Sequence, residues 1–140
     1  TRITFFTSAS YSSGRRDWAP SQRAWGGSLW TSIISPSQPA AAAARAVAGG
    51  ECEKGIVLCT TGIGVSIAAN KVKGIRCALL SDVMSARLTR EHNDTNMMAI
   101  GAAVVGEGLA LEIVDTWLDT QFSHNARHQR RIDKVMALER

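Results

Sequence analysis

The sequence has few of the features that mark secreted, metal-binding or membrane proteins. Its 140 residues include three cysteines, three prolines, one tyrosine and no run of 18 apolar residues. The missing run predicts that no helix spans a membrane, and Thr1–Phe6 lacks the basic segment and apolar core of a secretory signal. An odd number of cysteines without such a signal argues against a disulfide framework, so we expect a cytoplasmic protein. No histidine or cysteine cluster has zinc-ligand spacing, so no metal is predicted.

Positive charge is concentrated in one part of the chain. The net charge is +4 and the isoelectric point is near 9.3, a balance that raises the question of nucleic-acid binding. Residues 1–50 contain neither lysine nor glutamate, and their arginines carry the whole excess, whereas residues 51–140 have equal numbers of acidic and basic groups. The excess therefore marks an unusual segment, and we expect no nucleic-acid partner.

The order of apolar and polar segments predicts an α/β fold. Short apolar runs alternate with amphipathic helices over short connections, which is typical of βαβ units and a parallel sheet covered by helices. We expect a single domain over residues 1–140, atypical in 1–44 and extended by a C-terminal helix. The expected strands are 3–6, 29–34, 55–59, 75–80 and 97–100, and the expected helices are 40–47, 65–72, 82–90, 107–120 and 125–139.

One candidate site lies at the end of the strand 55–59. Cys59 is followed there by a glycine turn and a helix start, Thr60–Ser66. Unpaired N–H groups at such a turn bind an anion, and they favour the thiolate form of Cys59. A thiolate beside an oxyanion-binding loop suits removal of a proton next to a carbonyl. The alternative is a buried structural cysteine; the dinucleotide fingerprint is absent because position 67 is isoleucine.

Two further polar segments are candidates for chemistry. The segment Arg90–Asn96 contains His92, which can move a proton at neutral pH. We expect it near the carboxyl end of the sheet or approaching that end from a neighbouring chain. Arg127 and Arg131 are four residues apart and share one face of the last helix, which suits phosphate binding. The alternatives are a solvated helix end and a solvated basic face.

Four separated motifs, in order, resemble B-type ribose-5-phosphate isomerases, a family that includes galactose-6-phosphate isomerase subunits. The motifs are 55–76, 85–96, 109–118 and 127–131, so the resemblance covers about residues 45–140. It implies a Rossmann-like, three-layer α/β/α sandwich with a mostly parallel five-stranded sheet. It also implies a homodimer, or a dimer of dimers, with active sites shared between subunits. The implied reaction interconverts ribose 5-phosphate and ribulose 5-phosphate through a cis-enediolate, without metal or cofactor.

The resemblance also implies roles for individual residues. Cys59 would be the base that moves a proton between C1 and C2, and His92 would help to open the furanose ring. Asn93 would lie near the sugar, and Arg127 and Arg131 would hold the phosphate. The main chain of the turn would form the oxyanion hole, with the Thr61 hydroxyl able to assist; its residues are Thr61, Gly62, Ile63, Gly64, Val65 and Ser66.

The first third of the chain departs from the family pattern. Thr7–Ser10 stands where an Asp-His pair is expected, the Tyr-Pro-Asp segment is missing, Thr60 replaces a glycine, and Ala103 stands where an arginine is frequent. One hypothesis is that residues 1 to about 40 are a frame-shifted reading of the ordinary family start. The alternatives to a ribose-5-phosphate isomerase are a hexose-6-phosphate isomerase of galactose or allose type and a non-catalytic sugar-phosphate-binding subunit.

Overall fold

The computed structural model describes residues 3–7 and 37–139, which form one parallel sheet and five helices. The strands lie in the order β1-β2-β4-β3, and every neighbouring pair is parallel. The strand expected at 29–34 lies outside the described residues. Within the described residues the sheet has four strands. The strands are β1 (Ile3–Thr7), β2 (Lys54–Cys59), β3 (Cys77–Leu79) and β4 (Met97–Gly101).

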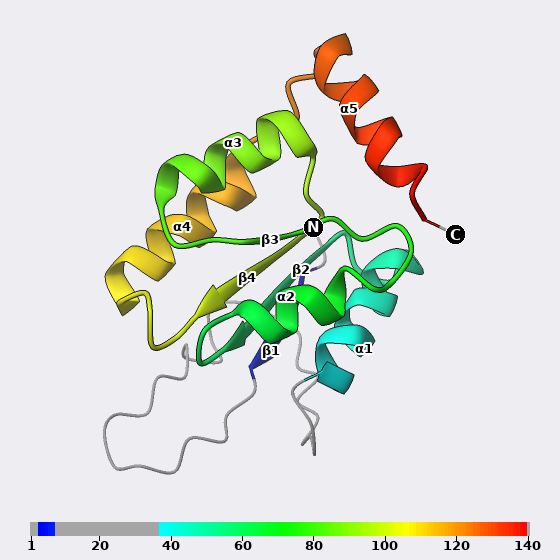
Figure 1. The fold of residues 1–140 in the computed structure, drawn as a ribbon. Coiled ribbons are helices and arrows are strands. Elements are labelled where there is room, and N and C mark those ends of the chain that lie inside the picture. The colour runs from blue at the N-terminus through cyan, green and yellow to red at the C-terminus, as the bar shows by residue number, and fades with distance from the viewer. Residues whose placement is uncertain (1–2, 8–36, 140) are drawn as a thin grey trace, which may run out of the picture.

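Helices cover both faces of the sheet, which confirms the expected three-layer arrangement (Figure 1). On one face, α1 (Ser37–Ala48) and α2 (Ile63–Ala69) pack on Val57 and Ala99. On the other face, α3 (Val83–Asn93) and α4 (Glu107–Asp119) pack on Ile56, Leu58 and Met98. Because alternate side chains of a strand point to opposite faces, the continuous apolar runs in β2 and β4 supply both cores.

The helix α5 (Ala126–Met136) lies outside these layers and contacts α3. Only two of its side chains, His128 and Ile132, are buried, and they are four residues apart on one face. No helix in the described part of the chain has the length and apolar character needed to cross a membrane.

Several predicted boundaries differ from the structure by a few residues, among them the helices expected at 40–47, 82–90 and 125–139. Two further differences have local reasons. The strand expected at 75–80 is shorter because the Arg76 N–H donates to Asn96 Oδ1 over 2.9 Å, which leaves the ladder to begin at Cys77. The helix expected at 65–72 begins and ends earlier, at Ile63 and Ala69. At its end, the Asn70 amide exchanges hydrogen bonds of 2.8 Å with the main chain of Cys77 and so connects α2 to β3.

The sequence motifs lie at opposite ends of the parallel sheet, some at the carboxyl ends of the strands and some at the amino ends. Cys59 pairs with Gly101 at the carboxyl end, and Gly55 pairs with Met97 at the amino end. Four residues of strand separate the two ends, roughly 13 Å at the usual rise. The helix α3 follows β3 and precedes β4, so it starts near the carboxyl end and finishes at the amino end.

Candidate active site

Cys59 is the last residue of β2, and its side chain is partly buried against the layer formed by α1 and α2. The sulfur Sγ accepts a hydrogen bond of 3.1 Å from the main-chain N–H of Gly62. An N–H dipole directed at sulfur stabilises a thiolate more than a thiol. The turn after β2 therefore places a main-chain donor directly against the Cys59 sulfur.

Two glycines let this turn lie directly against the end of β4. Gly62 has a φ of 76°, and a Cβ there would lie 2.5 Å from Leu79 Cδ1 and 2.9 Å from the carbonyl carbon of Ile100. A Cβ on Gly101 would lie 2.6 Å from the carbonyl oxygen of Thr61. The contacts with Ile100 and Thr61 are with main-chain atoms, which cannot move aside as a flexible side chain can, so larger residues would push the turn away from the sheet.

The turn also presents main-chain N–H groups. The Ser66 N–H donates to the Gly62 carbonyl over 3.1 Å, and the Ser66 hydroxyl donates to the Ile63 carbonyl over 2.7 Å. The Ile63 N–H is 3.4 Å from the Thr61 hydroxyl, a long bond. The N–H groups of Thr61, Gly64 and Val65 have no acceptor among the described residues. Free donors at a helix start are suited to a developing oxyanion.

His92 and Asn93 lie at the amino end of the sheet, in the last turn of α3. Asp94 ends the helix with a φ of 45°. Arg76 donates to the carbonyl oxygens of Asn93 and Asp94 over 2.9 and 2.7 Å, and it pairs with the Asp94 carboxylate at 3.3 Å. Bonds from a charged donor are stronger than neutral ones, so Arg76 fixes the main chain that carries His92 and Asn93.

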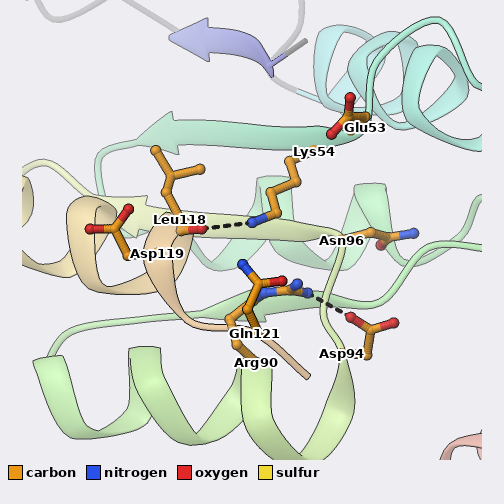
Figure 2. Close-up of a pocket in the computed structure, with 8 residues that line it drawn as sticks. All are labelled: Glu53, Lys54, Arg90, Asp94, Asn96, Leu118, Asp119 and Gln121. Atoms are coloured by element: carbon orange, nitrogen blue, oxygen red, sulfur yellow. Dashed lines mark hydrogen bonds and ion pairs between the residues drawn. The ribbon is translucent and has the colours of Figure 1, made fainter. Parts of the chain in front are cut away.

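Arg90 supports the same segment from the core side. It is 7% exposed, pairs with Asp94 Oδ1 at 2.8 Å and donates to the Thr95 carbonyl over 2.6 Å. Its guanidinium carbon lies 5.7 Å from the ring centroid of Trp117, within cation–π range. Figure 2 shows Arg90 and Asp94 beside Lys54 in a hollow of about 500 Å³. Burial, followed by the charge of Arg90, lowers the pKa of Lys54 from its ordinary value.

The helix α5 places its arginines beside the end of α3. The Arg127 and Arg131 side chains are both exposed, and Arg131 lines, together with Asn93, a hollow of about 360 Å³. Arg127 Nη2 is 3.4 Å from Nε2 of His128, whose ring centroid lies 4.2 Å from that of His92. The structure therefore gathers the four predicted site residues of α3 and α5 into one group, His92, Asn93, Arg127 and Arg131.

This amino-end group is separated from Cys59, which lies at the carboxyl end. The expectation that the segment 90–96 of the same chain lies near the carboxyl end is wrong, because α3 runs antiparallel to the strands and its last turn, which begins this segment, lies at the amino end. The other expectation, an approach from a neighbouring chain, stays a prediction. Ala103 does lie at the carboxyl end, where its N–H donates to the Thr60 carbonyl over 3.0 Å.

Sequence reasoning missed the side chains that hold the amino-end group in place. Arg90 and Asp94 have the four-residue spacing of a helical ion pair, which was a usable signal. The roles of Arg76 and His128 depend on contacts across the fold, and no local pattern indicates them. Among the described residues, no group of three or more histidine, cysteine and acidic side chains is placed to hold a metal.

Known proteins match most of this structure. A family profile described as Ribose/Galactose Isomerase matches residues 36–135. Ribose-5-phosphate isomerase B of Escherichia coli is 53% identical over 69% of this chain and 64% of its own length. The galactose-6-phosphate isomerase subunit LacB of Clostridium acetobutylicum is 44% identical over 67% of this chain and 54% of its own length.

Solved structures agree with the sequence matches. Ribose-5-phosphate isomerase B of Clostridium thermocellum superposes with a TM-score of 0.74 and 46% identity, covering 81% of this chain and 76% of that one. The Mycoplasma genitalium enzyme with bound ribulose-5-phosphate gives a TM-score of 0.71 and 35% identity, covering 81% and 75%.

The extent of these matches agrees with the resemblance found in the sequence. The chain spans 54 to 64% of the length of the first curated relatives that it matches. The profile begins at residue 36, close to the point where the recognisable pattern begins. From its profile match, its relatives and its fold, the chain belongs to the ribose/galactose isomerase family.

Proposed function

We propose that the chain is an aldose–ketose isomerase that interconverts ribose 5-phosphate and ribulose 5-phosphate. The observation that carries this proposal is the Cys59 sulfur, which receives the Gly62 N–H at the carboxyl end of a parallel sheet. In sheets of this kind ligands bind at the carboxyl ends of the strands. The family to which the chain belongs contains relatives named for this activity.

The proposed chemistry is a proton transfer within one substrate molecule. The Cys59 thiolate removes the proton from C2 of the open-chain aldose, and the electron pair forms the C1–C2 double bond of an enediolate. Negative charge develops on the oxygen of C1, where the free N–H groups of Thr61, Gly64 and Val65 stabilise it. The hydroxyl proton passes from the oxygen of C2 to the oxygen of C1, and the cysteine returns its proton to C1. The carbonyl of the ketose then forms at C2 and the thiolate is regenerated. No oxidant or reductant is consumed, so we propose no cofactor.

The remaining groups are proposed to come from a second copy of the chain. His92, Asn93, Arg127 and Arg131 are gathered at the amino end of the sheet, while Cys59 lies at the carboxyl end. In a two-fold dimer, the amino end of each subunit's sheet can lie against the carboxyl end of the other subunit's sheet, which forms two equivalent sites. In that arrangement His92 opens the sugar ring, Asn93 contacts the sugar, and the two arginines hold the phosphate.

A second candidate function is a sugar-phosphate-binding subunit that has little activity alone. The observation that favours it is Ala103, which lies against Thr60 at the carboxyl end, where family members often carry an arginine. Without that positive charge the Cys59 side of the site contributes less to phosphate binding. A hexose-6-phosphate isomerase of galactose or allose type uses the same chemistry, and it differs only in the length of sugar that the site admits.

The test is an assay of the purified chain with ribose 5-phosphate, in which formation of ribulose 5-phosphate is measured. Cys59→Ala should reduce kcat by about 10²–10⁴-fold, the usual contribution of a general base. Cys52→Ala is the matched control, because Cys52 is also partly exposed and lies before β2; it should retain activity. A fully active Cys59→Ala variant would contradict the mechanism. Binding without turnover would favour the second candidate, and turnover of galactose or allose 6-phosphate alone would favour the hexose enzymes.

A further inference from the structure

His128 is one of the buried polar side chains to which the proposed mechanism gives no role. His128 is 5% exposed and lies on the buried face of α5. Its ring contacts two groups that the mechanism does use. The ring centroid of His92 lies 4.2 Å away at an interplanar angle of 51°, and Arg127 Nη2 lies 3.4 Å from His128 Nε2. A single residue therefore touches both the group proposed to open the sugar ring and one proposed to bind phosphate.

These contacts define the protonation state of His128. A guanidinium only donates hydrogen bonds, so Nε2 must be the acceptor of the bond from Arg127. A histidine that accepts at Nε2 is neutral and carries its proton at Nδ1. Nδ1 lies 2.9 Å from the Ser123 hydroxyl, which therefore accepts. Both ring nitrogens have partners, and only the neutral ring offers the acceptor that the Arg127 guanidinium requires.

The charges around His128 favour the same state. Burial lowers the pKa of His128 from its ordinary value, and the positive charges of His92 on α3 and of Arg127 and Arg131 on α5 lower it further. The main-chain carbonyl of Glu91 acts in the opposite direction but does not outweigh them. The neighbour from the segment before α5, Ser123, is uncharged. The neutral ring therefore persists to a lower pH than in a solvated histidine.

We propose that His128 is a positioning residue whose neutral ring holds the side chains of His92 and Arg127 in one arrangement for binding a sugar phosphate. The proposal rests on the proposed function, because that function supplies the roles of His92 and Arg127. Protonation of His128 removes the acceptor at Nε2 and places a positive charge beside both partners. Arg127 is then released, so acid weakens phosphate binding through a residue that does not touch the substrate.

The first experiment measures the Kd of ribose 5-phosphate in a Cys59→Ala background, where turnover does not disturb the titration. His128→Phe keeps an aromatic ring against His92 but removes both nitrogens, and it should weaken binding about fivefold at pH 8, the effect of one lost hydrogen bond. The ratio of the Kd of the His128→Phe variant to the Kd of its Cys59→Ala parent should fall to one or below at pH 5, where His128 of the parent is itself protonated. Titration of the substrate phosphate is common to both proteins and cancels in the ratio.

A purely structural role for His128 predicts a different outcome. Lost packing of α5 would give a Kd ratio that does not change between pH 5 and pH 8, and that result overturns the proposal. Arg130→Ala is the control, since it removes a positive charge from an exposed position on the same helix without removing the His128 acceptor. It should show the same pH dependence as the parent protein.

A second measurement is independent of the sugar and of turnover. Nitrogen-15 NMR of histidine-labelled protein at pH 7.5 should show His128 as the Nδ1–H tautomer, and an Nε2–H tautomer would contradict the proposal. Wild-type protein that binds ribose 5-phosphate but does not convert it contradicts the isomerase activity, while the Kd ratio still decides the role of His128. Wild-type protein that binds no sugar phosphate contradicts both.

Discussion

The two ends of the sheet hold their candidate functional groups by different means. At the carboxyl end, main-chain atoms position Cys59: the Gly62 N–H meets its sulfur, and two glycines seat the turn on β4. At the amino end, charged side chains do this, since Arg76 and Arg90 bind the segment after α3. The proposed general base thus rests on a turn packed against the sheet, while the groups proposed to act in a partner's site project from helices. The two ends should therefore respond differently to substitution.

The largest effect on stability is expected at the amino end, from Arg90→Leu. The substitution removes the ion pair with Asp94 and leaves the Thr95 carbonyl without its buried donor. We expect a loss of about 3 kcal/mol in the free energy of unfolding, because Asp94 is partly solvated and retains Arg76. Urea denaturation measures this loss of free energy. Arg87→Ala, one turn earlier and exposed, is the control and should change stability little. Equal stability of the two variants would show that the ionic network does not support this end.

A smaller loss is expected at the carboxyl end, from Gly62→Ala. The positive φ and the contacts with Leu79 and Ile100 oppose a Cβ, so we expect about 2 kcal/mol of destabilisation. Gly64→Ala is a matched control two residues away, where a Cβ meets nothing within 4 Å. It should be neutral or slightly stabilising, because alanine favours a helix. If the two alanine variants unfolded at the same urea concentration, the turn would not depend on its glycine.

The smallest effect is expected in the reactivity of the thiols. Burial raises the pKa of Cys77 to about 12, so its thiolate is scarce at pH 8, whereas the sulfur of Cys59 receives an N–H. Iodoacetamide should therefore modify Cys59 at least about tenfold faster than Cys77, as measured by peptide mass spectrometry. In urea the difference should disappear. Faster modification of Cys77 in the folded protein would contradict the contrast between these cysteines.

The sequence predicted the layers of the fold well, because burial on both faces of a central strand leaves a continuous apolar run. The runs at β2 and β4 and the helices between them were all expected, and only boundaries moved where side chains such as Asn70 and Asn96 bind main chain across the fold. The family was recognised from four motifs. Residues 29–34, expected as a further strand, lie outside the described residues.

The candidate site was predicted only in part. Cys59 and its turn are contiguous in sequence, so local patterns indicated both the residue and its surroundings. The place of His92 follows from the direction of α3, which only the topology defines. The contacts of Arg76 with Asn93 and Asp94 and of His128 with His92 join residues 17 or more positions apart, and no periodicity encodes such contacts. Local sequence patterns therefore indicated the candidate site residues, but they did not indicate the side chains, such as Arg76 and His128, that contact them across the fold.

The most direct test of the shared site is to combine two inactive variants, Cys59→Ala and His92→Asn. Each variant alone should show little turnover of ribose 5-phosphate, because every site lacks one essential group. When equal amounts are unfolded and refolded together, half of the dimers are mixed, and each mixed dimer contains one site with both groups intact. The account predicts recovery of about one quarter of wild-type activity. A mixture no more active than its separate components would contradict a site built from both ends of the sheet.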